Sequence, residues 1–213
     1  MDRLAVRQRV RIRFSKTGDL RFIGHHDLVR TLERLFRRAE LPLAFSQGFH
    51  PKPKISFPLA LALGLEGHNE VLELELTEAL STDEILARLQ RATVPGLAFH
   101  SVEPVPPGTR KAQVSRVTYE IRVPSEREGM VRSRLDAIDA HSRVEMTQQG
   151  QAVERNLLDH LLDWSLKDGR LSFTLRVDPC GSLHPREVLR ILGLDDLESQ
   201  GIPLVRSRVE VVS

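Results

Sequence analysis

Residues 19–58 read DLRFIGHHDLVRTLERLFRRAELPLAFSQGFHPKPKISFP, and this stretch decides the fold of the first half of the chain. Apolar residues recur at intervals of three and four from Leu28 to Phe36, which predicts a helix over residues 26–39 that Pro42 ends. A Gly-His-His-Asp motif precedes this helix, and a Gly-Phe-His-Pro-Lys-Pro-Lys turn follows it. Neither motif is explained by helix or strand periodicity. Both therefore indicate a surface that meets a partner, without showing which reaction, if any, takes place there.

Alternating patterns on either side of this stretch predict strands. In residues 6–14, apolar positions alternate with arginines, which places the two kinds of side chain on opposite faces of a strand. Further strand patterns lie at residues 55–63, 70–77 and 97–105, and a helix with an acidic first turn follows Ser81. The resulting order, β-α-β-β-α-β, is that of a ferredoxin-like unit.

A similar order of elements follows a Pro-rich segment. It comprises strand patterns at 117–123, 143–146, 161–166, 171–177 and 203–212, and helix patterns at 126–140 and 184–192. We therefore predict an α+β protein of two tandem ferredoxin-like (βαββαβ) units with antiparallel sheets. The expected boundaries are an N-terminal domain with a basic motif face at residues 1–106, a linker at 107–115 and a C-terminal domain at 116–213.

The composition indicates an ordinary globular protein of the cytoplasm. Hydrophobic residues make up 40% and charged residues 28% of the 213 residues, and no apolar run is long enough to cross a bilayer. The Arg-rich N-terminus has no apolar segment behind it, so we expect no secretory signal. The single cysteine, Cys180, has no disulfide partner within the chain.

Charge is distributed unevenly along the chain. Residues 1–58 carry a net charge of +8 and residues 66–103 a net charge of −6, although the whole chain carries only +2. A basic face that meets an acidic partner, most commonly nucleic acid, is one interpretation. The other is that these charges only solvate helix and strand faces, which remains open for the helix arginines Arg34, Arg37 and Arg38.

Phosphate binding without catalysis fits the basic segment best. Glycines at positions 24 and 48 permit close approach of the backbone, and the helix start presents free amide groups. The phenylalanines at positions 22, 45 and 49 either stack on bases or belong to the core. The expected RNA- or phosphate-binding residues are Arg11, Arg13, Arg21, Arg30, Lys52 and Lys54.

Catalysis is a second hypothesis. His25, His26 and His50 are the candidates for acid–base work on a ribose hydroxyl, with Lys52 and Lys54 stabilising the phosphorane. The alternative is that a histidine caps the helix and the Pro-Lys-Pro-Lys turn is a rigid surface loop. No metal-ligand spacing supports a metal site, and we expect no cofactor.

The turn before the last helix reads Asp-Pro-Cys-Gly-Ser-Leu-His-Pro from position 178. Ser182 is the predicted cap of that helix. Cys180 as a nucleophile would need a base and a lowered pKa, and a thiol buried in the turn is favoured.

Four segments, residues 19–30, 47–57, 63–66 and 178–192, together resemble the radical SAM-linked proteins of unknown function. The residues singled out in these motifs are Gly24, His25, Asp27, Gly48, Phe49, Pro51, Pro53 and Ser182. Family members often have Ser-His-Leu-Asp at the first motif and Gly-Phe-Asn-Pro-His-Pro-Lys at the second. Gly24, His26, His50 and Lys52 therefore depart from the pattern, whereas His25, Asp27, Pro51, Pro53 and Lys54 match it. The resemblance implies a radical SAM protein as partner and a role in presenting a substrate.

These observations lead to one prediction and two alternatives. We predict an accessory, substrate-binding module for a radical SAM partner that binds RNA (tRNA or rRNA) or an RNA-linked substrate. Its cations and histidine-bearing bends would form one basic hollow. The chain lacks the cysteine triplet that holds an iron–sulfur cluster, so a radical reaction would belong to the partner. The alternatives are a metal-independent endoribonuclease resembling the CRISPR repeat-processing nucleases, and a protein-only scaffold.

Overall fold

The computed structural model describes residues 8–148, 151–178 and 181–212. The described chain divides into two compact units. Unit 1 comprises the described residues up to Gln113 together with Val212, and unit 2 comprises Val114–Val211.

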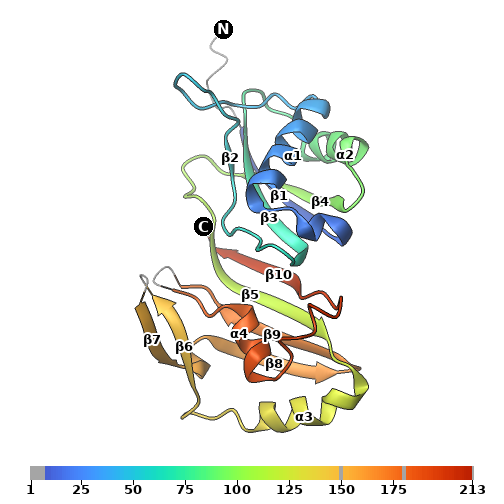
Figure 1. The fold of residues 1–213 in the computed structure, drawn as a ribbon. Coiled ribbons are helices and arrows are strands. Elements are labelled where there is room, and N and C mark those ends of the chain that lie inside the picture. The colour runs from blue at the N-terminus through green and yellow to red at the C-terminus, as the bar shows by residue number, and fades with distance from the viewer. Residues whose placement is uncertain (1–7, 149–150, 179–180, 213) are drawn as a thin grey trace. The chain divides into compact units, whose positions relative to one another are not determined.

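Unit 1 is an antiparallel sheet with two helices (Figure 1). Its elements are β1 (Gln8–Lys16), the 3-10 helix η1 (Gly18–Phe22), α1 (His25–Arg38), β2 (Ile55–Ser56), β3 (Glu66–Leu76), α2 (Thr82–Ala92) and β4 (Leu97–Val105). The strand order is β4-β1-β3, and the short β2 also pairs with β3. Every strand pair of this unit runs antiparallel.

The alternation in β1 produces the two faces of the sheet that the sequence predicts. Val10, Ile12 and Phe14 are at most 1% exposed and belong to a core that the apolar residues of α1 and α2 complete. The intervening arginines lie on the opposite face. Helix α1 ends just before Glu40, which has a left-handed backbone conformation with φ 53°. Helix α2 begins after Ser81, whose hydroxyl group caps it by accepting a hydrogen bond from the Glu84 amide.

The predicted strand at residues 55–63 is wrong beyond Ser56. The chain continues from there as an irregular segment that buries Leu61 and Leu65. Pro58 has no amide hydrogen, so it cannot donate to a strand ladder. The apolar run reflects packing of an irregular segment rather than a long strand.

Unit 2 contains four neighbouring sheet strands and a separate hairpin. Its elements are β5 (Gln113–Arg122), α3 (Ser125–Asp136), β6 (Arg143–Gln148), β7 (Gln151–Asn156), the 3-10 helix η2 (Leu157–Asp159), β8 (Leu161–Lys167), β9 (Arg170–Arg176), α4 (Pro185–Ile191) and β10 (Val205–Val212). The sheet has the order β10-β5-β9-β8, and β6 pairs only with β7 among the described strands. Strand β5 begins at Gln113, within the segment predicted as a linker.

The predicted α+β class is confirmed, because both units combine helices with antiparallel strand pairs. The more specific arrangement of two tandem ferredoxin-like units stays a prediction. Strand β7 was not predicted from the sequence: its residues are mostly exposed, so no alternation of apolar positions marks it. None of the helices in the described ranges combines the length and apolar character needed to span a bilayer.

Gly96 offers a test of packing in unit 1. Its φ is +85°, and a Cβ atom there would lie 2.7 Å from the backbone oxygen of Thr17. Gly108 has a similar φ of +80° but open space around it. We expect Gly108→Ala to lower the free energy of unfolding by about 1–2 kcal/mol through backbone strain, and Gly96→Ala by about 1–3 kcal/mol more through the clash. Urea unfolding measures both, and equal losses would contradict the packing argument.

Candidate functional site

The arginines of β1 are part of a charge ladder within the sheet of unit 1. Arg11 lies directly across from Glu73 of β3, and its Nη2 donates to Glu73 Oε1 at 3.0 Å. Arg13 Nη1 donates to Asn69 Oδ1 at 3.1 Å. The side chain of Arg11 is only 13% exposed, and that of Glu73 2%. The structure therefore places two of the predicted phosphate ligands, Arg11 and Arg13, in contact with β3 side chains.

A hollow of about 500 Å³ opens beside this ladder. Its charged lining consists of the cations Arg9, Lys52, Lys54 and Lys111 and the carboxylates Glu73 and Glu75. Lys54 Nζ lies 3.2 Å from Glu75 Oε2, and Arg9 Nη2 donates to the carbonyl oxygen of Thr109 at 2.5 Å. Four cations thus face two carboxylates, which leaves the hollow with a positive balance that suits an anion.

The lysines of this hollow are a large share of the lysines of the chain. The sequence holds 26 arginines but only five lysines, and three of the five, Lys52, Lys54 and Lys111, line this hollow. Of the other two, Lys16 is buried and donates from Nζ to a backbone oxygen, and Lys167 is exposed in unit 2. A lysine ammonium is a compact point charge with rotatable donors, which suits the oxygens of a phosphate group.

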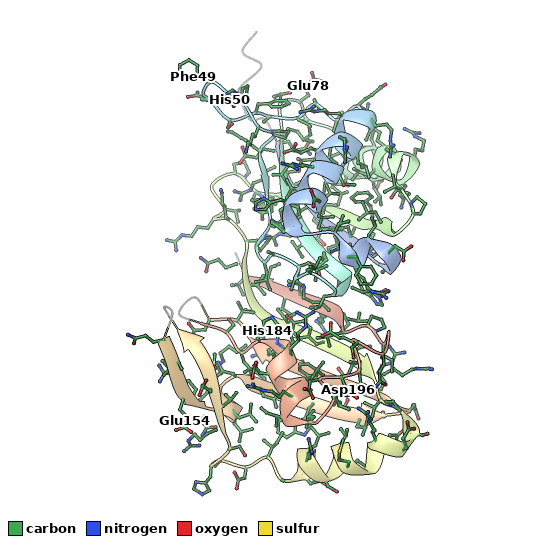
Figure 2. All side chains as sticks on the ribbon, viewed as in Figure 1. Phe49, His50, Glu78, Glu154, His184 and Asp196 are labelled. Atoms are coloured by element: carbon green, nitrogen blue, oxygen red, sulfur yellow. The ribbon has the colours of Figure 1, made fainter. Side chains whose placement is uncertain are left out.

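A closed loop carries Phe49 next to the hollow. We call residues 46–52 the Phe49 loop. The Ser46 amide donates to the Lys52 carbonyl oxygen at 2.9 Å, and the Lys52 amide donates to Ser46 Oγ at 3.0 Å. Figure 2 shows Phe49 and His50 projecting from one end of unit 1, and Phe49 is fully exposed. Pro51 has a fixed φ just before this closure, which limits the backbone conformations of the loop that carries the ring.

The Gly-His-His-Asp motif forms the start of α1. Gly24 is the N-cap residue and has no side chain to cap the helix. His25 packs its ring edge-on against Phe57, with the centroids 5.0 Å apart, whereas His26 is exposed. Asp27 Oδ1 lies 3.6 Å from Arg30 Nη1 in an exposed pair.

The three candidate catalytic histidines do not come together. His25 and His26 lie at the start of α1, and the aromatic contacts of His25 place it near the beginning of β3. His50 lies in the Phe49 loop, which follows the bridge from Leu43 to Leu76 at the other end of β3. Within the described ranges, no group of three or more His, Cys, Asp or Glu side chains is placed to hold a metal ion.

The six predicted phosphate ligands fall at separate places. The guanidinium of Arg21 lies over the Phe22 ring, 4.4 Å from its centroid, and its Nη1 is 3.7 Å from Glu66 Oε1. Only Lys52 and Lys54 share the hollow. The expectation of one hollow that unites these cations with the histidine-bearing bends is therefore wrong.

Two helix arginines have structural roles at the ends of α1 and α2. Arg38 of α1 donates from Nη2 to the backbone oxygen of Ala92, the last residue of α2. Arg88 of α2 donates from Nη1 to the backbone oxygen of Glu40, just beyond α1, at 2.8 Å. The carbonyl groups at helix ends lack partners within the helix, so each helix supplies a donor to the end of the other.

The turn before α4 differs from the prediction in its capping residue. Ser182 Oγ accepts a hydrogen bond from the Asp178 amide at 2.9 Å, within the turn. The cap of α4 is His184, whose Nδ1 accepts from the Arg186 amide at 3.3 Å. Burial, followed by the nearby Arg186 charge, lowers the pKa of His184. Cys180, the other residue considered in this turn, lies outside the described residues.

The fold and the hollow define an α+β protein with a candidate anion-binding surface in unit 1. The chain belongs to the family described as "Uncharacterized protein conserved in bacteria (DUF2344)", whose profile matches residues 9–185. No curated protein matches the chain. A crystal structure of an unknown protein from Galdieria sulphuraria is similar at 13% identity and a TM-score of 0.29, over 97% of this chain and 99% of that one. That level of similarity carries no information on function.

His184 gives a prediction on pH and stability. Its pKa in the folded protein lies below the ordinary value of 6.5, so the folded state binds fewer protons than the unfolded state as the pH falls from about 6.5. The stability contributed by neutral His184 is complete above that pH and is lost as the pH drops through the folded pKa. We expect His184→Asn, which keeps a good cap, to lose less stability than the wild type between pH 7.5 and pH 5.5.

The comparison needs urea unfolding at both pH values. His184→Ala serves as the control, because loss of the cap should lower the free energy of unfolding by about 1 kcal/mol at pH 7.5. The same pH dependence in the wild type and in His184→Asn would show that His184 does not contribute to it.

Proposed function

We propose that this chain is a binding module that holds RNA, or a substrate carrying RNA, on unit 1 for a radical SAM partner. The observation that carries the proposal is the lysine-lined hollow beside the fully exposed Phe49. Its role would be to position a ligand rather than to carry out the reaction. A location in the cytoplasm belongs to this proposal and is supported by the single cysteine of the sequence.

We also infer that each unit is ferredoxin-like. In that fold four strands of the order β-α-β-β-α-β form a sheet in which the first and third strands lie in the middle. Unit 1 has the order β4-β1-β3 with β2 on β3. Unit 2 has the order β10-β5-β9-β8, if the hairpin of β6 and β7 is treated as an insertion. Both orders support the inference of a duplicated unit.

The hollow and the Phe49 loop suit different parts of a nucleic acid. Lys52, Lys54 and Lys111 can neutralise backbone phosphates, a contact that does not depend on sequence. The Phe49 ring can stack on a base, because every base has a π-face. RNA with unpaired bases offers both groups side by side, which is why it fits better than a purely anionic ligand.

The partner is implied by the resemblance alone. The chain has one cysteine, so it does not hold the three thiolates that an iron–sulfur cluster of this class requires, and radical chemistry would belong to another protein. The endoribonuclease alternative gains no support from the geometry, because His50 is remote from His25 and His26. The protein-only scaffold remains as an outcome of the binding test.

The lysines give the first test of RNA binding. We expect single-stranded RNA to bind the full chain with an affinity that falls steeply with salt, because phosphate neutralisation releases counterions. The double change Lys52→Ala and Lys54→Ala should reduce the slope of log affinity against log salt by about 1.4, at about 0.7 per lost phosphate contact. Fluorescence anisotropy at several salt concentrations measures this slope.

Lys167→Ala is the matched control, since Lys167 is an exposed lysine of unit 2 outside the hollow. It should leave the slope unchanged. Absence of salt-sensitive RNA binding, together with co-purification of an iron–sulfur protein from native lysate, would replace the proposal with the scaffold.

Phe49 gives an independent test. Because its side chain is fully exposed, Phe49→Ala should leave the free energy of unfolding unchanged within about 0.5 kcal/mol. Loss of a stacked base should weaken RNA binding by about 1–3 kcal/mol, which is roughly 5- to 150-fold. Anisotropy at one low salt concentration measures the loss, and Phe49→Trp should retain the affinity. Unchanged affinity in Phe49→Ala would exclude stacking by this loop.

A further inference from the structure

The solvent face of the unit 2 sheet carries two pairs of directly opposed arginines. Strands β5 and β9 pair in a register that sets Arg116 across from Arg176 and Arg122 across from Arg170. All four side chains are exposed, while every second residue between them on each strand is buried in the core. Residues directly opposite on one face of an antiparallel pair have Cβ atoms about 4.5–5.5 Å apart, so like charges there repel each other.

The two pairs differ in how this repulsion is compensated. In the second pair, Arg170 Nη1 lies 2.9 Å from Glu120 Oε2, so a carboxylate offsets the charge. In the first pair, neither Arg116 nor Arg176 has a carboxylate within 4.0 Å or a side-chain hydrogen bond to any described residue. Two guanidinium groups therefore face the solvent side by side without an anion from the described chain.

The surroundings of Arg116 suit a polar ligand. An open hollow of about 570 Å³ extends from Arg116 along the sheet, past the hydroxyl groups of Thr118 and Thr174, which lie 3.0 Å apart. Three carboxylates also line it, and none of them forms an ion pair with Arg116 within 4.0 Å. Glu210 pairs with Arg208 at 3.4 Å, Glu120 with Arg170, and Asp163 stands across from Thr174.

We propose that Arg116 and Arg176 form a binding site for the oxyanion of a phosphate group. Two guanidinium forks on adjacent strands can each bind a different pair of oxygens of one tetrahedral anion, whereas a carboxylate fills only one fork. The hydroxyl groups and Asp163 would then lie beside the ester part of the ligand, where they accept hydrogen bonds from sugar hydroxyls. The site lies in unit 2 and goes beyond the function proposed for unit 1.

Inorganic phosphate is the probe, added to the full chain. We expect phosphate to raise the melting temperature by about 2–4 °C over sodium chloride at equal ionic strength, because it binds the folded state. Arg116→Gln and Arg176→Gln should each abolish this difference. In chloride alone, both variants should be as stable as the wild type or more stable, because each removes a like-charge contact.

Arg122→Gln is the matched control, since it alters the opposed pair that already has Glu120. It should keep the full phosphate effect, and isothermal titration should detect phosphate binding to this variant but not to Arg116→Gln. Equal phosphate effects in all variants, or equal loss in Arg122→Gln, would overturn the proposal.

Two further experiments show whether the bound phosphate group belongs to a small ester or to an RNA backbone. A ribose phosphate that binds more tightly than inorganic phosphate indicates a small ester. A reduced salt slope for single-stranded RNA in Arg116→Gln indicates an RNA backbone. The Lys52 and Lys54 double variant should keep its phosphate response in either case, so a failure of RNA binding at unit 1 remains distinguishable from a failure of this site.

Discussion

The register of β1 against β3 is the constraint on which the structure of unit 1 depends. Val10 and Ile12 lie across from Leu74 and Leu72, which aligns the apolar side chains of both strands beneath the helices. The same register sets Arg11 across from Glu73 on the other face. A slip of β1 by one residue would turn its arginines towards the core and its apolar residues towards solvent, while the leucines of β3 stayed in place. Hydrophobic burial and ion pairing therefore specify one and the same alignment.

This ladder changes how the charges of unit 1 act. The basic first segment and the acidic segment that follows belong to neighbouring strands, so part of the net charge of +8 is offset by carboxylates of the −6 segment. Removing Glu73 would leave arginine side chains without their carboxylate in a poorly exposed layer, which is costly. Cations that can still attract a ligand lie at the rim, where Lys52, Lys54 and Lys111 outnumber the nearby carboxylates.

The sequence predicts local structure well and contacts between distant segments poorly. Periodicity locates α1 to within one residue at each end, because its buried positions repeat at helical spacing. The predicted bounds of β4 also agree with the structure, although its buried positions alternate only at the start of the strand. The sequence does not show that Arg11 would meet Glu73, since strand register is a tertiary property. It also led to the prediction that the two histidine-bearing bends would meet in one basic hollow. The 54–65 segment runs the length of β3, so His25 and His50 lie towards opposite ends of that strand.

The two units handle exposed arginines on their sheets in different ways. In unit 1, the arginines of β1 alternate with apolar residues and meet carboxylates or amides of β3, so their face is largely neutralised from within. In unit 2, Arg116 meets Arg176, and a structure that tolerates two opposed guanidinium groups must either accept the repulsion or relieve it with an external anion. In the second like-charged pair, Glu120 of β5 forms an ion pair with Arg170, so the same two strands can supply a neutralising carboxylate themselves. Among the described residues, no carboxylate forms an ion pair with Arg116 or Arg176 within 4.0 Å, and this singles out that end of the sheet.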